Sequence, residues 1–500
     1  MRKTGFIINV FIMTGSMLII RLAGMISNVY ISARAGAEAM GLYHVIFSVY
    51  SFAITLSVSG TGLAATRLIT EQMGRKTGAD VRNVIGKCLV IATAMSLFAS
   101  VILFFGAEFI SENIISDKRC IPALKVLALS LLPIGASAVL RGHMIAVRKA
   151  GMLTVSQIAE EFSAIFVTVA LLKNYAGTPY AYMAMIIGNA FSELFAFFFD
   201  FVSCRITLRK SFGKKADIRF KNILDICVPI ALGSYLRSGL VALENVLIPG
   251  KLAQYGIENP LSEYGLIRAM AMQIMLFPTV FIQSFASMLV PEMSEMHAAM
   301  RKNGIRYVAS LAIKCTLIFS FAAAAVFIKY HDALAVSLYK NKNVGIYLGM
   351  LALLAVPMYL DTVVDSMLKG LNEQMSSLKF NIADSILRVI AIWLFLPKYG
   401  IKAYIILLYA SELFNLSLSL GKLISVSGVR INIREYFLPP ATCCVFSFVI
   451  VNKLNFSGFV PEIIVFVAIY LLLSYLFSMF SNFTAQKRSA AKQSVRRIEI

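Results

Sequence analysis

Charged side chains are scarce in this chain of 500 residues. Asp, Glu, Lys and Arg together make up 15% of it, and hydrophobic residues make up 59%. Soluble globular proteins carry about a quarter charged residues, so this balance argues against an ordinary water-soluble domain. Apolar runs of about 20 residues, the length that crosses the hydrocarbon core of a bilayer, recur along the whole chain. The sequence therefore predicts an all-α protein that crosses a membrane many times.

The residue types of common catalytic and metal centres are also scarce. The chain has four histidines, one tryptophan and seven cysteines, and no two cysteines have the CxxC spacing of many metal and redox sites. It contains no HExxH motif, no DxD-like cluster and no Ser-His-Asp set. No segment between apolar runs is long enough to hold a soluble catalytic domain. These features favour a protein that is not an enzyme and holds no cofactor.

The apolar runs divide into 14 candidate membrane spans joined by short connections. They lie near residues 6–33, 42–70, 84–106, 121–140, 152–172, 180–204, 222–249, 263–290, 306–328, 344–368, 379–397, 402–421, 437–452 and 459–481. With a cytoplasmic N-terminus, the inside segments carry 26 of the 47 Lys and Arg residues and the outside segments carry 10. Basic residues collect on the cytoplasmic side of membrane proteins. We therefore expect a multi-pass protein of a bacterial inner membrane with both termini in the cytoplasm.

The net charge of +21 would suggest a nucleic-acid partner if it lay on one soluble face. Here the basic excess lies mainly in the connections between spans, above all in the segment from Arg205 to Lys221, which has seven basic residues and one acid. A solvated cytoplasmic loop is one interpretation of this segment, and contact with anionic lipid headgroups is the other. Nucleic acid is not an expected partner.

The basic loop divides the chain into two halves that share a weak repeat. Gly41 and Gly265 are 224 residues apart, and Glu71 and Glu295 are separated by the same number of residues. Paired six-span halves with a substrate site between them are common in secondary transporters. We expect a first lobe at 1–206, a basic cytoplasmic loop at 207–221, a second lobe at 222–425, two more helices within 436–481 and a cytoplasmic tail at 482–500.

Short motifs occur in a fixed order along the chain. They are Arg21-Leu-Ala-Gly24, Gly41-Leu-Tyr43, Ser59 to Glu71, Leu247 to Leu252, Tyr264-Gly265, Phe277-Pro278-Thr279, Leu289 to Glu295, Leu368 to Asn372, and Arg388. This set resembles the stage V sporulation protein B branch of the MOP flippase superfamily, which is related to MurJ-like lipid II flippases and to polysaccharide exporters. The resemblance covers nearly the whole chain. It departs at 25–28, where MurJ-like proteins usually have a second arginine.

The resemblance implies a fold and a function. The fold is two six-helix lobes facing a V-shaped central cavity, with helices 13 and 14 forming a groove for a polyprenyl tail. The function is a flippase that moves an undecaprenyl-diphosphate-linked oligosaccharide, lipid II or a related cell-wall or polysaccharide precursor, from the inner to the outer leaflet by alternating access. The implied partners are this lipid and the membrane lipids, and the family default is a monomer. Vegetative wall, spore cortex and capsule stay open as destinations of the sugar.

Four arginines within the predicted spans are candidates for the substrate site. An ionisable side chain in mid-span is costly unless it faces a cavity or a partner, and a guanidinium binds phosphate oxygens in pairs. The resemblance places spans 1, 2, 7 and 8 around the cavity. We therefore expect diphosphate binding by Arg21, Arg67, Arg237 and Arg268. Two alternatives stay open, since Arg67 can extend to the membrane surface and Arg237 can pair with Glu244.

Acidic residues in the spans are candidates for coupling transport to Na⁺ or a proton. The candidates are Glu244, Asp361, Asp365, Asp384 and Glu412, together with the amide Asn381. Asp361 and Asp365 are four residues apart and share a helix face. Asn381, Asp384 and Glu412 form an oxygen-rich set of the kind that binds Na⁺, with the metal expected at Asn381 and Asp384. In the alternative interpretation, Asp384 and Arg388, also four apart, neutralise each other.

Glu160 and Glu161 are further acids in mid-span, and Glu193 lies in the next span. Adjacent residues point about 100° apart on a helix, so at most one of the pair is expected to face the cavity. The main alternative function is a multidrug or cation antiporter of the MATE type. That function favours 12 spans and an acidic or aromatic cavity, whereas 14 spans and four arginines favour the flippase.

Overall fold

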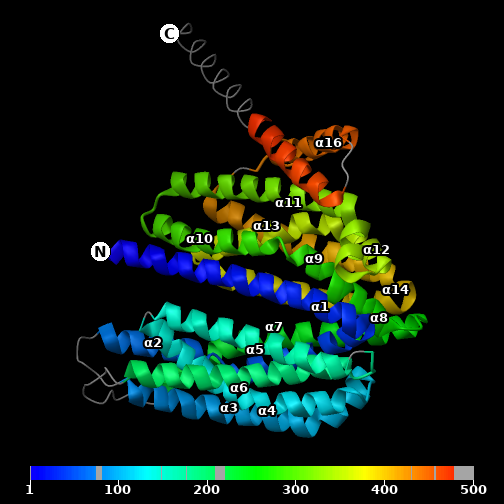
Figure 1. The fold of residues 1–500 in the computed structure, drawn as a ribbon. Coiled ribbons are helices and arrows are strands. Elements are labelled where there is room, and N and C mark those ends of the chain that lie inside the picture. The colour runs from blue at the N-terminus through cyan, green and yellow to red at the C-terminus, as the bar shows by residue number, and fades with distance from the viewer. Residues whose placement is uncertain are drawn as a thin grey trace, which may run out of the picture. The chain divides into compact units, whose positions relative to one another are not determined.

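The described part of the chain is almost entirely helical. The computed structural model describes residues 2–74, 81–147, 149–175, 177–208, 220–429, 431–454 and 458–477. These residues form helices joined by short turns, with no β-strand among them (Figure 1). In hydrocarbon every backbone N–H and C=O must be paired within the protein, and a helix pairs nearly all of its own. The predicted all-α, multi-span fold is confirmed.

The described helices correspond to the predicted spans. Ten of them are long and apolar enough to cross a membrane, and a pair bent by 57°, Pro260–Leu276 with Thr279–Ala298, makes an eleventh. Two of the ten, with 55 and 54 residues, each contain two predicted spans, and Leu438–Lys453 is a shorter apolar helix. Once the long helices are divided, the described helices match the 14 predicted spans one for one. The basic residues at 209–219 and the tail at 482–500 lie outside the described residues.

Glycine marks the division of both long helices. Helix α1 (Arg2–Val58) is interrupted at Gly36, with φ 82° and ψ 165°, and α14 (Gln374–Ser427) is interrupted at Gly400, with φ 57° and ψ −138°. Each glycine falls between two predicted spans. A positive φ is accessible to glycine because it has no Cβ, so the helix axis changes direction there without a longer loop.

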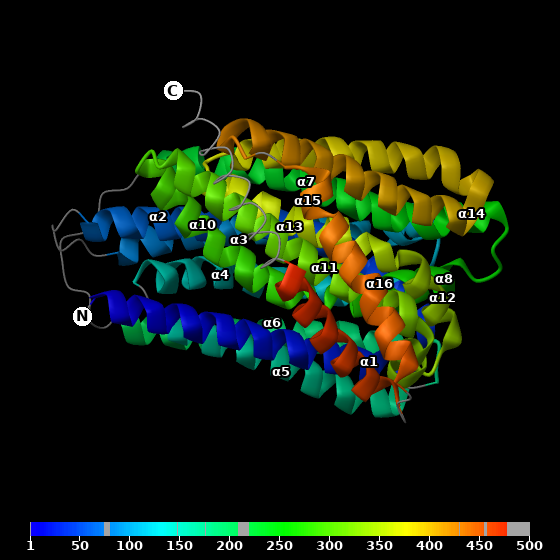
Figure 2. The same cartoon turned by 90° about the horizontal axis from the view of Figure 1, so that it is seen from above.

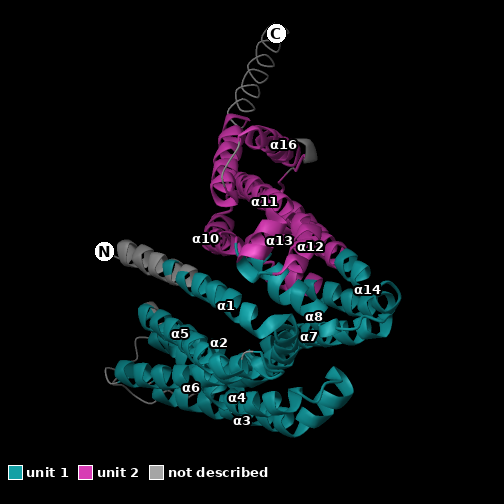
Figure 3. Ribbon diagram, turned by 45° about the vertical axis from the view of Figure 1, so that its right-hand side comes forward, with its two compact units in different colours: residues 1–277, 338–340, 381–407 teal, residues 278–337, 341–380, 408–500 magenta. Residues whose placement is uncertain are grey.

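The structure divides into two compact units, coloured separately in Figure 3. The first consists of residues 1–277, 338–340 and 381–407. After α1 its elements are α2 (Thr61–Gly74), α3 (Arg82–Phe109), η1 (Ile110–Ile115), α4 (Cys120–Ala146), α5 (Ala150–Tyr175), α6 (Ala181–Leu208), α7 (Phe220–Tyr255), α8 (Pro260–Tyr264), the π-helix η2 (Gly265–Ala271) and α9 (Met272–Leu276). Helix α4 packs against α3 and α6, and α5 packs against α6 and α1 (Figures 1 and 2).

The second unit consists of residues 278–337, 341–380 and 408–500. Its described elements are α10 (Thr279–Ala298), α11 (Lys302–Tyr339), α12 (Lys342–Leu351), η3 (Ala352–Leu354), α13 (Ala355–Gly370), both ends of α14, α15 (Ile433–Tyr436), α16 (Leu438–Lys453) and a C-terminal helix, Phe459–Phe477. The unit boundary near Phe277 is not at the predicted basic loop, and the two predicted lobes with their cavity stay a prediction.

Two glycines bring α1 and η2 into backbone contact within the first unit. A Cβ on Gly41 would lie 2.0 Å from the Leu261 carbonyl oxygen, and a Cβ on Gly265 would lie 2.0 Å from that of Ala37. Each glycine therefore meets the carbonyl four residues before the other, so the contact is reciprocal. The two glycines are also equivalent positions of the sequence repeat.

Three helices of the second unit are joined by one lysine. Lys329 Nζ on α11 forms an ion pair of 2.6 Å with Glu462 Oε1 on the C-terminal helix and donates a hydrogen bond of 2.5 Å to Asn452 Oδ1 on α16. Side chains including Ala325, Cys444 and Phe466 form an apolar core between the same three helices. The C-terminal helix pair is thus anchored on α11.

Candidate functional site

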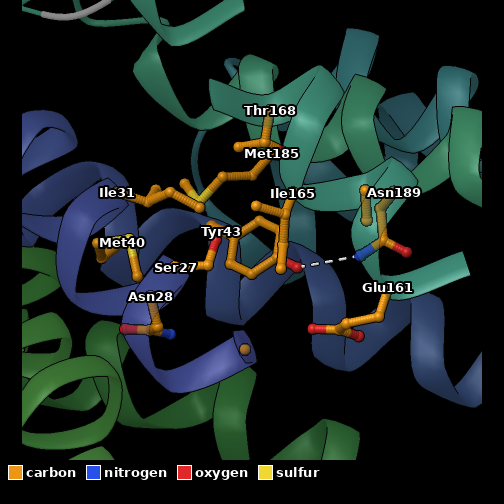
Figure 4. A pocket seen from close by; sticks show the side chains of 12 residues that line it. Ser27, Asn28, Ile31, Met40, Tyr43, Glu161, Ile165, Thr168, Met185 and Asn189 are labelled. Carbon is orange, nitrogen blue, oxygen red and sulfur yellow. Dashed lines mark hydrogen bonds between the residues drawn. The ribbon is translucent and has the colours of Figure 1, made fainter. Parts of the chain in front are cut away.

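A polar cavity lies within the first unit, between α1, α5 and α6. Its volume is about 160 Å³, and its polar lining is Ser27, Asn28, Tyr43, Glu161, Thr168 and Asn189. Asn189 Nδ2 donates a hydrogen bond to the Tyr43 hydroxyl at 3.2 Å, and Glu161 lies beside this pair (Figure 4). Polar groups inside a membrane bundle are costly unless they serve a partner, so this cavity is a candidate site.

Arg21 lies on α1 about one turn before the cavity. Glu161 Oε1 approaches α1 so closely that a Cβ on Gly24 would lie 2.9 Å from it, and this carboxylate interacts electrostatically with Arg21. The Arg21 side chain is exposed and forms no ion pair with a described residue. The predicted substrate arginine therefore lies about one turn along α1 from Gly24, which lines the cavity, and its charge is partly balanced by Glu161.

A second polar cluster is buried between α4, α5 and α6. Arg141 forms ion pairs with Glu160 (Nη2–Oε2, 2.5 Å) and with Asp200 (Nε–Oδ2, 2.7 Å). Ser156 donates a hydrogen bond of 2.5 Å to the other oxygen of Asp200, whose side chain is fully buried. Glu193 interacts electrostatically with all three charged groups, so the acids outnumber the one guanidinium.

Sequence reasoning identified only part of this cluster. Arg141 lies one residue beyond the predicted span 121–140 and so counted as a loop residue, and Asp200 was not singled out within span 180–204. The position of the Asp200 carboxylate inside an apolar span was the signal that could have identified it. The expectation for the adjacent acids is confirmed, because Glu161 lines the cavity whereas Glu160 turns toward Arg141.

A third polar cluster in the first unit contains several predicted residues. Arg388 on α14 forms ion pairs with Glu244 on α7 (Nη1–Oε1, 3.3 Å) and with Asp384. Arg268 on η2 interacts electrostatically with Glu244 and Tyr404, and the Tyr264 hydroxyl donates a hydrogen bond of 3.0 Å to Asn245 Oδ1. Two guanidiniums thus balance two carboxylates. The suggested ion pair of Asp384 with Arg388 is present, and Asn381 lies one turn before Asp384 on the same helix.

Arg67 and Arg237, the two remaining candidate arginines, lie outside the polar clusters described above. Arg67 on α2 forms an exposed ion pair of 2.9 Å with Glu71, in keeping with a position near the membrane surface. Arg237 on α7 is exposed and pairs with no described acid, Glu244 included. Its neighbour Ser238 accepts a hydrogen bond of 3.0 Å from Thr55 on α1, so the helix is fixed in place while the arginine stays unpaired.

The other predicted acids lie together in the second unit. Asn415 Nδ2 donates a hydrogen bond of 3.0 Å to Asp361 Oδ2, and the Ser377 hydroxyl donates one of 2.8 Å to Asp365 Oδ1. Both Asp365 and Glu412 interact electrostatically with Asp361. The structure thus joins Asp361, Asp365 and Glu412 and places Asp384 in a different cluster.

The structure can be compared with the Na⁺ site that was expected at Asn381 and Asp384. Within the described residues, no group of three or more His, Cys, Asp or Glu side chains is placed to hold a metal ion. At the expected position, Asp384 and Glu244 already hold the Arg388 guanidinium, which supplies the positive charge that a metal would bring. The residues around Asp384 therefore do not fit a Na⁺ ion as they stand.

Comparison with known proteins places this arrangement in a family. Residues 6–297 match the family model described as polysaccharide biosynthesis protein. The chain belongs to that family. It is 21% identical over 463 residues to stage V sporulation protein B of Bacillus subtilis (strain 168), covering 90% of this chain and 89% of that protein. It is 19% identical over 334 residues to sporulation protein YkvU of the same organism, covering 65% and 73%.

Solved structures identify the fold of this family member. The lipid II flippase MurJ in an inward closed conformation matches with a TM-score of 0.73 and 14% identity, over 93% of this chain and 98% of the flippase. An inward-facing MATE-family multidrug resistance transporter of the MOP superfamily matches with a TM-score of 0.63 and 14% identity, over 83% of this chain and 100% of the transporter. The chain is a multi-pass membrane protein with the fold of the MOP-superfamily transporters.

Proposed function

We propose that this protein is a flippase for an undecaprenyl-diphosphate-linked oligosaccharide, such as lipid II or a related wall or polysaccharide precursor. It moves the lipid from the inner to the outer leaflet of the bacterial cell membrane by alternating access. In this proposal both termini are cytoplasmic, and the protein works as a transporter without a catalytic step of its own.

The observation that carries this proposal is that Arg21 and Arg237 are exposed and form no ion pair with a described residue. Both are exposed at mid-span on helices of the same unit, α1 and α7. Neither forms an ion pair with a described residue, and Glu161 balances the charge of Arg21 only in part. An unpaired guanidinium in the hydrocarbon zone requires an anionic partner, and a diphosphate offers two charges and several acceptor oxygens. Arg268 and Arg388, in contrast, are balanced by carboxylates, so we assign the diphosphate to the first pair.

The comparisons support this function over export of organic cations. The match to the lipid II flippase extends over 93% of this chain, whereas the MATE transporter is matched along its whole length and covers 83%. This chain therefore has more sequence than a MATE fold uses, in keeping with two additional helices. Unpaired arginines would also repel a cationic drug.

The test is rescue of a bacterium depleted of its own lipid II flippase, with this chain expressed from a plasmid. We expect growth to be restored by the wild-type chain and by Arg67→Ala, whose arginine is engaged with Glu71 at the surface. We expect no growth with Arg21→Ala or Arg237→Ala, although immunoblotting of membranes finds both variants at wild-type levels.

Two results would contradict the proposal. Failure of the wild-type chain to rescue, with normal insertion and no flipping of any polyprenyl diphosphate sugar in proteoliposomes, would exclude the substrate class. Rescue by both arginine variants would exclude these residues from the site. Extrusion of a cationic dye from the same proteoliposomes would favour the MATE-type function.

A further inference from the structure

Two basic side chains in the first turns of α11 have no acidic partner. Arg306 and Lys314 are both exposed, and neither forms an ion pair with a described residue. They lie eight residues apart with Ser310 midway between them, so all three share one face of the helix. Lys314 lies well inside the predicted span 306–328, where an ammonium is costly unless it has a partner. This face of α11 therefore carries two cations that an anion would stabilise.

Tyr436, at the end of α15, packs against this face. Its hydroxyl oxygen lies 2.7 Å from Ser310 Oγ in a shared hydrogen bond, and Lys314 Nζ lies 5.0 Å from the centroid of its ring. A side chain on a helix points back toward the N-terminus of that helix, so the Lys314 ammonium lies closer to Ser310 than the spacing along the backbone suggests. The Tyr436 side chain is buried, and it fixes the position of the ammonium through the ring contact.

Two open pockets of the second unit share Tyr436. The first has a volume of about 440 Å³, and its other lining residues are Arg306, Tyr307, Ser310, Gly428 and Val429. The second has a volume of about 190 Å³ and lies between α11, α16 and the C-terminal helix. Its lining includes the charged side chains of Lys314 and Glu435 and the apolar side chains of Leu311, Ile318, Pro440 and Phe477. A pocket with a guanidinium thus adjoins a pocket with an ammonium and an apolar wall.

Arg306 also lies against the C-terminal end of α14. A Cβ on Gly428 would lie 2.9 Å from Arg306 Nε and 3.0 Å from its Nη2. Gly428 caps α14 with a positive φ of 68°, so no side chain separates the helix end from the guanidinium. The end of a helix carries a partial negative charge of about half an elementary charge. This end orients Arg306 and balances only part of its charge.

The charges and the apolar wall point to one kind of ligand. Among the described residues that line the two pockets, Arg306 and Lys314 bring two positive charges and Glu435 brings one negative charge. Glu435 accepts a hydrogen bond of 3.4 Å from Asn432 and forms no ion pair with either cation. The sum of one positive charge matches a phosphodiester, which carries one negative charge. A free phosphate would leave the apolar wall uncovered, whereas a phospholipid has an acyl chain beside its phosphate.

We propose that the two pockets around Tyr436 bind one anionic glycerophospholipid. Its phosphodiester lies between Arg306 and Lys314, and one acyl chain lies along α16 and the C-terminal helix. The lipid joins α11 to the end of α14 and to the C-terminal helix pair. It is a resident of the site and is not transported, so its binding does not depend on the proposed flippase function. In the topology proposed above, it belongs to the cytoplasmic leaflet.

Binding is tested by native mass spectrometry of the purified full-length protein in detergent, without a transport assay. The protein is titrated with phosphatidylglycerol or with phosphatidylcholine that has the same acyl chains. We expect the wild type to bind one phosphatidylglycerol at a lower concentration than it binds phosphatidylcholine. The double variant Arg306→Gln, Lys314→Gln should bind phosphatidylglycerol at least about tenfold more weakly, because it loses the charged donors to the phosphate.

The matched control is the double variant Arg301→Gln, Lys302→Gln. It removes two exposed basic side chains from the same end of α11, and neither of them lines the two pockets. The loss of net charge equals that of the test variant, so we expect phosphatidylglycerol to bind the control as it binds the wild type. If the test variant cannot be purified, the comparison of Lys314→Gln with Lys302→Gln decides the question.

The proposal is overturned if the wild type binds the two phospholipids equally, or if both double variants lose binding to the same extent. Equal losses would show a general attraction of lipid to the basic end of α11. Displacement of the bound lipid by inorganic phosphate would assign the site to a free anion. Preferential binding of undecaprenyl diphosphate, lost in the test variant, would assign the site to the transported lipid and would also overturn the proposal.

Discussion

Arg388 and Glu244, 144 residues apart in the chain, form an ion pair within the first unit. The Glu244 side chain is 3% exposed, and Arg388 also holds Asp384 one turn earlier on its own helix. Arg388 therefore links α14 to α7 and neutralises acids that would otherwise be buried with their charge. Because the cluster is balanced, it is suited to holding the helices together.

Replacement of Arg388 by Met should destabilise the protein strongly. Removal of one partner of a buried ion pair typically costs about 3–5 kcal/mol because the other charge stays buried alone. We expect a large drop in the thermal midpoint of purified Arg388→Met. The triple variant Arg388→Met, Glu244→Gln, Asp384→Asn should regain most of the loss, and an equally low midpoint for the triple variant would contradict this explanation.

The buried cluster of Arg141 and the exposed pair of Arg67 offer a matched comparison. Both arginines pair with acids, but Asp200 is fully buried whereas Arg67 and Glu71 are 65% and 44% exposed. We expect Arg141→Met to cost on the order of 3–5 kcal/mol. Arg67→Met should cost at most about 1 kcal/mol, because water and salt screen exposed pairs. Midpoints of unfolding in the same detergent give the comparison, and equal losses would show that burial does not decide the effect.

The contact between Gly41 and Gly265 predicts a sharp difference between glycines. Alanine at Gly265 would place its Cβ 2.0 Å from a backbone oxygen of α1, and a backbone cannot move aside as a flexible side chain can. We expect Gly265→Ala to lower stability by at least about 1–3 kcal/mol. Gly250→Ala is the control, because no atom lies within 4 Å of its added Cβ. It should be neutral or stabilise α7 by up to about 1 kcal/mol, and similar losses for both would speak against the contact.

Glu373 gives stability a pH dependence outside the membrane spans. The Ser376 hydroxyl donates a hydrogen bond of 2.6 Å to its carboxylate and Lys422 pairs with it at 3.1 Å, and both lower the pKa of Glu373 below its ordinary 4.5. A carboxyl with a lower pKa in the folded state stabilises the fold above its unfolded pKa, and this contribution is lost as pH falls through the folded pKa. We expect Glu373→Gln to unfold at a lower temperature than wild type at pH 7. The gap should narrow as the pH falls from 4.5 down through the lowered pKa of Glu373, and a gap that stays constant over this fall would exclude this origin.

The spans and the membrane class follow from the sequence because apolar runs of fixed length leave few alternatives in a bilayer. Gly36 and Gly400, where the two long helices are interrupted, each lie between two of these apolar runs. The partners of the charged residues were harder to predict. The Asp384–Arg388 pair follows from spacing on one helix, whereas the Glu244–Arg388 pair depends on how α7 and α14 pack. Arg141 was missed because helix ends are read with an error of a few residues. Asn415 carries no charge, and only the structure reveals its hydrogen bond to Asp361.

The reciprocal contact of Gly41 and Gly265 has the form of a subunit interface. In a two-fold symmetric dimer, residue i of one subunit meets residue j of the other, and j meets i. Here Gly41 meets Leu261 and Gly265 meets Ala37, with the same four-residue step on both sides. This relation is expected if two copies of an ancestral six-helix protein, once associated as a homodimer, were fused by gene duplication.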